Sequence, residues 1–204
     1  MSGIKLRPIV FKVEPPAPTA TLLKELAAIT YTKNSGYHNQ DVGVSPTQQY
    51  VCLIGDYDLT SIASSNGQYF TGFQRNGQQG YLQLCNVGTS LSSFKMAFDV
   101  NGSSGASNVV ADGDSMISSG WCFNSNLIAT HAAVKFIFDR TNNTFSFYLK
   151  PNNASSWTKI CHGSTSIIDD MSIWQVYQNS NYYAGTAGPY QVYESSDVSL
   201  LEAL

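Results

Sequence analysis

The chain has 204 residues, only 12% of them charged, and a formal net charge of −3. The 11 lysines and arginines are scattered, so the sequence lacks the basic stripe of nucleic-acid-binding proteins and the basic amphipathic helix of membrane-surface proteins. No stretch is long and apolar enough to span a membrane, and the N-terminus lacks the apolar core of a signal peptide. We therefore expect synthesis in a host cytoplasm, with no nucleic-acid or membrane partner.

Residues 1–30 are expected to form an N-terminal arm. Three prolines within Pro15-Pro16-Ala17-Pro18 favour a stiff extended connector, and Thr19 to Thr21 can cap a short helix over residues 22–29. Such a helix is too short to be stable alone and must dock on the domain or on another copy. We predict that its apolar stripe drives homo-oligomerisation, most simply as a trimer; the stripe consists of Leu22, Leu23, Leu26 and Ile29.

Residues 31–197 read as strands separated by turns. The clearest pair is 134–139 and 144–150, in which Val134 and Phe136 alternate onto one face and a polar turn lies between the runs. Further strands are expected at 50–54, 68–74, 80–85, 94–100, 120–123, 157–161 and 172–177. No helical patterns of 10 to 15 residues alternate with them, so a parallel α/β sheet is not expected. Residues 198–204 form a C-terminal apolar tail.

The hairpin at 134–149 resembles the paired strands of concanavalin A-like (laminin-G-like) jelly-roll lectins, and residues 70–77 with 80–84 are similar to another hairpin of that family. The resemblance implies an all-β, antiparallel two-sheet jelly-roll sandwich that often binds glycans. It carries no metal site to this chain. The nearest sequence to a calcium loop is Asp112-Gly113-Asp114, which we interpret as a solvated turn, so no metal or cofactor is expected.

The composition is also similar to that of viral and phage surface proteins, which are low in charge and rich in Ser, Asn, Gly and Tyr. This resemblance implies a domain on a virion surface, docked to other virion proteins through its N-terminal arm. The partner would be a host glycan or protein.

The positions of the acidic residues argue against glycosidase activity. Jelly-roll glycosidases place two acidic residues across a cleft, but no glutamate lies between residues 26 and 193. Asp56 and Asp58 would share a strand face. A catalytic pair made of two aspartates therefore stays open as an alternative. His38, His131 and His162 show no ligand spacing. We expect a protein that is not an enzyme.

Aromatic residues crowd the C-terminal region, where 178–190 reads as a long loop. Tyrosine supplies flat area with a polar tip, and asparagine supplies adaptable hydrogen bonds. We predict ligand binding by Tyr177, Tyr182, Tyr183, Tyr190, Tyr193 and Asn181. The alternative is that some of these rings only cap the ends of the sandwich.

Three functions remain open from the sequence. The first is a non-catalytic virion surface module, such as a capsid decoration, fibre or spike domain, with lectin-like recognition. The second is a free-standing soluble lectin, and the third is an aspartate-based glycan-active enzyme. Cys52, Cys85, Cys122 and Cys161 have no metal or redox spacing, and we expect buried free thiols.

Overall fold

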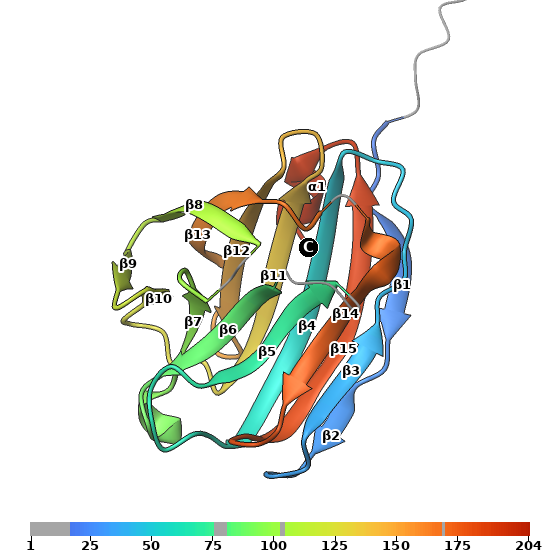
Figure 1. Ribbon diagram of the computed structural model, residues 1–204. Coiled ribbons are helices and arrows are strands. Elements are labelled where there is room, and N and C mark those ends of the chain that lie inside the picture. The colour runs from blue at the N-terminus through green and yellow to red at the C-terminus, as the bar shows by residue number, and fades with distance from the viewer. Residues whose placement is uncertain (1–16, 76–80, 103–104, 169) are drawn as a thin grey trace, which may run out of the picture.

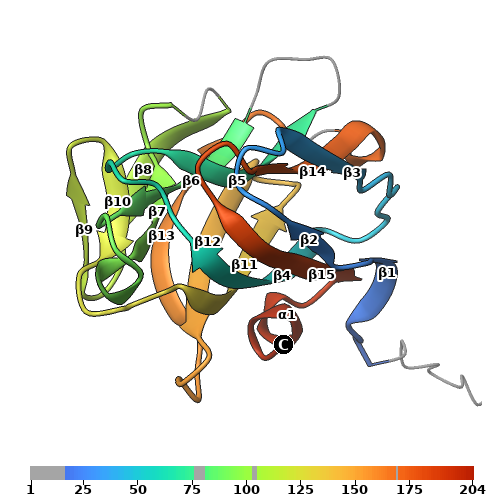
Figure 2. The ribbon, with the colours of Figure 1, turned by 90° about the horizontal axis from the view of Figure 1, so that it is seen from below.

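Alternating apolar and polar residues along most strands give two antiparallel sheets that face each other across one core (Figure 1). The computed structural model describes residues 17–75, 81–102, 105–168 and 170–204. Within them, the predicted antiparallel two-sheet jelly-roll sandwich is confirmed. Figure 2 shows the sheets as two layers, with the C-terminal helix on the outer side of one of them.

The first sheet has eight strands in the described residues. In spatial order they are β1 (Thr21–Leu26), β15 (Ala184–Ser195), β4 (Tyr50–Ser61), β11 (His131–Asp139), β12 (Thr144–Pro151), β13 (Thr158–Thr165) and β8 (Ala106–Ala111), with β2 (Ile29–Tyr31) also paired to β15. The predicted hairpin is confirmed as β11 and β12, which pair from Ala132↔Pro151 to Asp139↔Thr144.

The second sheet has seven strands in the described residues. Their spatial order is β3 (Tyr37–Asp41), β14 (Trp174–Asn179), β5 (Tyr69–Arg75), β6 (Tyr81–Val87), β7 (Lys95–Asp99), β10 (Trp121–Asn124) and β9 (Ser115–Ser118). Two single 3-10 turns, Leu91–Ser93 and Met171–Ile173, and the helix α1 (Val198–Glu202) complete the described elements. None of the helices described is long and apolar enough to cross a membrane.

Aromatic rings from both sheets fill the core. Phe136 of β11 lies 4.9 Å from Phe73 of β5, and Phe138 lies 5.1 Å from Trp174 of β14, ring centre to ring centre, both in edge-to-face geometry. Such pairs are favourable beyond the area they bury. The four cysteines are buried, as predicted, and are free thiols. Burial raises the pKa of Cys52 to about 12, partly offset by Lys135, so this thiol is unreactive.

The predicted helix at 22–29 is wrong, because this segment forms β1 and β2 instead. β1 pairs with β15 from Thr21↔Glu194 to Leu26↔Tyr190. Its side chains alternate irregularly because the register shifts between Leu22 and Lys24. The edge of β15 offers a full ladder of hydrogen bonds, which outweighs the weak preference of a two-turn helix.

The predicted oligomerisation stripe is therefore not one face of a helix. Leu22 is exposed, Leu23 and Ile29 are half-buried, and Leu26 is buried in the core of its own chain. The sandwich consequently begins at β1 rather than at residue 31. Of the predicted arm, residues 1–16 lie outside the described residues.

The C-terminal tail is covered by its own sandwich. Leu201 of α1 is buried against Cys52, Ile137 and Tyr148 on the outer face of the eight-stranded sheet. Lys135 reaches out from β11, and its Nζ donates to the carbonyl oxygens of Leu201 at 3.2 Å and Glu202 at 2.6 Å. A lysine at the C-terminus of a helix satisfies carbonyls that the helix itself leaves unpaired.

Candidate functional site

A groove lies on the outer face of the seven-stranded sheet. It has a volume of about 420 Å³ and crosses the four adjacent strands β3, β14, β5 and β6, which Figure 1 shows side by side. Its described lining consists of four tyrosines and four amides: Tyr37, Tyr69, Tyr81, Tyr177, Asn39, Asn179, Gln74 and Gln83.

Strand alternation explains why these residues meet. In β14, Trp174 and Val176 enter the core, so Tyr177 and Asn179 point to the other face. β6 alternates in the same way, with Leu82 inside and Gln83 outside. Register then brings residues from four separate strands into rows across the sheet.

Gly72 shapes the middle of the groove. It pairs with Tyr177 on one side and Gln83 on the other. A Cβ at this position would lie 2.7 Å from Cε1 of Tyr177 and 2.6 Å from the carbonyl oxygen of Leu82. Glycine therefore lets the Tyr177 ring lie across the neighbouring strand, where it meets the Tyr81 ring edge to face at 6.4 Å. The glycine makes room for the aromatic part of the groove.

A second row forms a chain of hydrogen bonds along one side of the groove. The register aligns Asp41, Gln175, Gln74 and Tyr81. Gln74 Nε2 donates to Gln175 Oε1 at 3.2 Å, and Gln175 Nε2 donates to Asp41 Oδ1 at 2.7 Å. We call this row, Asp41–Gln175–Gln74, the amide ladder.

The described lining of the groove is electrically neutral. Burial raises the pKa of Tyr177 well above its ordinary value, with a partial opposing effect from its hydrogen bond with Gln83. Burial also raises the pKa of Tyr69, and Asp99 raises it further. These two phenols therefore keep their protons at physiological pH. The groove offers hydrogen-bond donors and acceptors beside aromatic rings.

The structure does not bring the sequence-predicted ligand residues together. Residues 184–195 form β15, so the prediction of a long loop over 178–190 is wrong. Of the predicted set, Tyr177 lines the groove. Tyr182 is exposed on the short turn before β15, and Tyr193 is half-buried on the outer face of the opposite sheet.

Tyr183 and Tyr190 are core residues. Both are fully buried, so neither can be displayed to a partner. The Tyr183 hydroxyl donates to the carbonyl oxygen of Gln68. The Tyr190 hydroxyl donates to the hydroxyl oxygen of Tyr57 at 2.8 Å. Asn181 donates its main-chain N–H to Asn179 Oδ1 at 3.0 Å, which orders the turn. The positions of Tyr183 and Tyr190 therefore agree with the alternative interpretation, in which these rings have a structural role.

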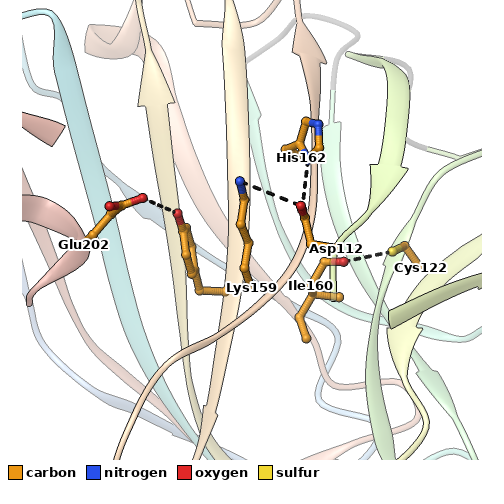
Figure 3. Close-up of polar contacts among 7 residues, drawn as sticks. Asp112, Cys122, Lys159, Ile160, His162 and Glu202 are labelled. Atoms are coloured by element: carbon orange, nitrogen blue, oxygen red, sulfur yellow. Dashed lines mark hydrogen bonds and ion pairs between the residues drawn. The ribbon is translucent and has the colours of Figure 1, made fainter. Parts of the chain in front are cut away.

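One cluster of charged side chains lies on the opposite sheet from the groove. Asp112 Oδ2 lies 2.9 Å from His162 Nδ1, and Asp112 Oδ1 lies 3.9 Å from Lys159 Nζ, beside β13 (Figure 3). The same view shows Cys122 donating to the carbonyl of Ile160. Asp112 thus has a histidine and a lysine as neighbours. Within the described ranges no three histidine, cysteine or acidic side chains cluster as metal ligands.

The aspartates considered for catalysis lie on the outer face of the eight-stranded sheet. Asp56 and Asp58 line a separate hollow of about 300 Å³, and they share one strand face, as the sequence predicts. Asp58 Oδ1 is 2.6 Å from His131 Nδ1. Burial raises the pKa of Asp56, and Lys150 lowers it in part.

Most groove residues were missed by the sequence analysis. Tyr37, Asn39 and Asp41 alternate along β3, but this strand carries no buried apolar residue that would mark it as a strand. Gln74, Tyr81 and Gln83 lie in segments that were predicted as strands. Their alternation indicated which side chains point outward, and this was the signal that could have found them.

The sequence matches no protein-family model and no curated protein. Solved structures similar to the model include the CBM40 module of the Ruminococcus gnavus IT-sialidase, with 14% identity, a TM-score of 0.46, and coverage of 88% of this chain and 97% of that one. The metal-free lectin I-B4 of Griffonia simplicifolia has 10% identity, a TM-score of 0.42, and coverage of 91% and 95%. Peanut lectin has 12% identity, a TM-score of 0.39, and coverage of 91% and 94%. At these values the likeness carries no functional argument, which rests on the groove.

Proposed function

We propose that the chain is a non-catalytic, lectin-like domain that binds glycans in the groove on the seven-stranded sheet. The observation that carries this proposal is the lining itself, which combines tyrosine rings with side-chain amides and has no charged member among the described residues. Its volume of about 420 Å³ falls within the usual range of small-ligand sites.

Each of the two residue types in the lining matches one kind of group on a sugar. A pyranose ring presents C–H groups on its faces, and these pack against the flat surface of a tyrosine. Its hydroxyls both donate and accept, as the amides of Asn39 and Gln74 do. Tyr37 is 64% exposed, so an apolar ring at one end of the groove is available for stacking.

The test is a set of alanine variants measured on a glycan array and then by calorimetry with the strongest binder. Tyr81→Ala and Asn39→Ala should each lower the affinity by about tenfold, since each removes one stacking or hydrogen-bonding partner. Tyr182→Ala is the matched control, because Tyr182 is an exposed tyrosine outside the groove lining.

Two results would contradict the proposal. One is an array on which no glycan binds above background. The other is binding that Tyr182→Ala reduces and Tyr81→Ala leaves unchanged, which would move recognition to the turn before β15.

We further propose that the domain binds without cleaving. Asp56 and Asp58 belong to the sheet opposite the groove. Two of the glutamates already serve the fold: Glu194 accepts from the main chain of Thr47 at 2.6 Å, and Glu202 accepts from the Tyr148 hydroxyl at 2.9 Å. Bound oligosaccharides should be recovered intact after prolonged incubation, as judged by mass spectrometry.

The virion surface stays a prediction from composition, with the free-standing lectin as its alternative. A capsid decoration, fibre or spike domain would co-purify with particles, and a free lectin would not. Immunoblotting of particles separated on a density gradient distinguishes the two.

A further inference from the structure

We infer that Cys122 and Cys161 are a latent disulfide site, at which oxidation joins the two sheets by a covalent bond. Neither residue lines the groove, so the inference does not depend on glycan binding. It rests on where the four buried thiols of the chain lie relative to one another.

The four cysteines occupy three different places in the sandwich. Cys122 and Cys161 both belong to the core between the sheets, with Cys122 on β10 of the seven-stranded sheet and Cys161 on β13 of the eight-stranded sheet. Cys52 lies in the cluster on the outer face of the eight-stranded sheet, and Cys85 lies in a separate cluster. The fold therefore brings one pair together and keeps the other two thiols apart.

A β-bulge in β13 shapes the surroundings of Cys161. The register between β12 and β13 passes from Phe147↔Cys161 to Tyr148↔Lys159, so Ile160 is the extra residue. In a regular strand adjacent side chains point to opposite faces. At this bulge, however, Ile160 and Cys161 are both buried in the core. The thiol of Cys161 thus faces the other sheet.

The strands that carry the two thiols come close to each other across the core. Cα atoms of β10 lie within 8 Å of Cα atoms of β13, whereas facing sheets are usually about 10 Å apart. Cys122 Sγ donates to the carbonyl oxygen of Ile160, the residue before Cys161, at 3.3 Å (Figure 3). The two thiols also form a hydrogen bond with each other. Close approach of this kind is what a disulfide between two strands requires.

The hydrogen bond between the thiols makes them chemically unequal. It lowers the pKa of Cys122, against the opposing effect of burial. Burial, together with the same hydrogen bond, raises the pKa of Cys161 well above its ordinary value. Because the thiolate is the nucleophile in disulfide exchange, Cys122 is the attacking residue and Cys161 is the one that resolves the intermediate.

The oxidant in this proposal is a low-molecular-weight disulfide such as oxidised glutathione. The Cys122 thiolate attacks one of its sulfur atoms and releases one glutathione thiolate, which leaves a mixed disulfide on Cys122. Cys161 then loses its proton and attacks Cys122 Sγ, which forms the bond between the sheets and releases the second glutathione. Two protons and two electrons leave the protein, and the oxidant is reduced to two thiols.

Both thiols are fully buried in the folded chain. Exchange with the oxidant therefore takes place during folding, or when the sandwich opens locally. Once formed, the bond closes the chain from residue 122 to residue 161. This restricts the unfolded state and so stabilises the folded one.

The experiment refolds the full chain from denaturant in a buffer of reduced and oxidised glutathione, beside a sample refolded under a thiol reductant. We expect the oxidised sample to lose the mass of two hydrogen atoms, and its peptide map to link Cys122 to Cys161. Its melting temperature should be about 5–10 °C higher than that of the reduced sample. Added reductant should reverse both changes.

Four single variants locate the bond. Cys122→Ala and Cys161→Ala should each abolish the mass loss and the rise in melting temperature. Cys52→Ala and Cys85→Ala are the matched controls and should keep both. If either of the first two variants fails to fold, alkylation of the oxidised, unmodified chain after denaturation decides: Cys122 and Cys161 should be protected, and the other two cysteines should be alkylated.

Three results would overturn the inference. The first is alkylation of all four cysteines after oxidative refolding. The second is a disulfide that includes Cys52 or Cys85. The third is an oxidised chain that melts below the reduced one, which would mean that the folded sandwich does not accept the bond.

Discussion

At the scale of the residue, Asp139 organises the central hairpin. Its Oδ1 accepts from the main-chain N–H of Thr141 at 3.0 Å and of Asn142 at 3.1 Å, and its Oδ2 accepts from Asn142 Nδ2 at 2.7 Å. Asn143 follows with φ at +54°, a conformation that asparagine tolerates better than most residues. One carboxylate thus fixes the turn that sets the register between β11 and β12.

Asp139→Asn should destabilise the protein in a pH-dependent way. Burial raises the pKa of Asp139, but hydrogen bonds from Asn142, Gln49 and Thr141 together outweigh it, so the pKa lies below its ordinary value of 3.8. A carboxyl with a lowered folded-state pKa stabilises the fold above its ordinary pKa, and loses that contribution as the pH falls through the folded-state value. The carboxyl is partly exposed to water, which screens these contacts, so at pH 7 we expect a cost of about 1 kcal/mol or less.

Denaturant unfolding of both proteins between pH 7 and pH 2 measures this effect. The difference in unfolding free energy should be full at pH 7 and shrink below about pH 4. Asp114→Asn serves as the control and should show no such trend. A difference that stays constant down to pH 2 would mean that the charge of Asp139 does not hold the turn.

At the scale of the element, the C-terminal helix is fastened by a buried lysine. Lys135 is fully buried and lies over the Trp157 ring at 4.5 Å while it donates to the last carbonyls of α1. Burial lowers its pKa, partly offset by Cys52 and Glu202. A helix of five residues would not persist alone, so α1 depends on this contact and on Leu201.

Deleting residues 198–204 should therefore destabilise the sandwich strongly. The deletion uncovers Cys52 and Ile137 and leaves the Lys135 ammonium without its carbonyl partners, at a cost of about 3–5 kcal/mol. We expect the melting temperature to fall by about 5–15 °C in a calorimetric scan. Deleting only residues 203–204 keeps both carbonyls and should change little. Equal melting temperatures for the two deletions would show that α1 only rests on the sheet.

At the scale of the whole molecule, the apolar segments that motivated a trimer lie in contact with their own chain. Leu26 and Leu201 are buried in the same sandwich from which they come. Homo-oligomerisation stays a prediction. If the chain does form oligomers, the segment that joins the copies has to be another part of the chain, and residues 1–16 are one candidate.

Light scattering of the full chain and of a form lacking residues 1–16 tests the oligomeric state. The predicted trimer requires the full chain to have the mass of three copies, and an arm-driven trimer requires the shortened form to fall to one copy. This deletion leaves β1 and β2 in place, so the sheet is preserved. A mass of one copy for both proteins would show that the prediction is wrong.

The sequence by itself determined the fold class and its central elements. In 134–138 and 145–149 every second residue is apolar, and a polar turn lies between the two runs, so this local pattern predicts a hairpin with one face toward a core. The strands β4, β5, β6, β7, β10, β13 and β14 follow from the same signal. The burial of the cysteines also follows, because each of Cys52, Cys85 and Cys122 lies in an apolar run.

The conformation of residues 22–29 and the position of the groove depend on tertiary structure and could not be read from the local sequence. The segment at 22–29 forms strands because the edge of β15 is available to pair with it, and no local pattern contains that edge. The residue type does not distinguish Tyr183 and Tyr190 from Tyr37 and Tyr81. Tyr183 and Tyr190 are nevertheless buried in the core, whereas Tyr37 and Tyr81 line the groove. Which face a side chain occupies depends on register between strands distant in the sequence, and the groove exists only where four such strands lie side by side.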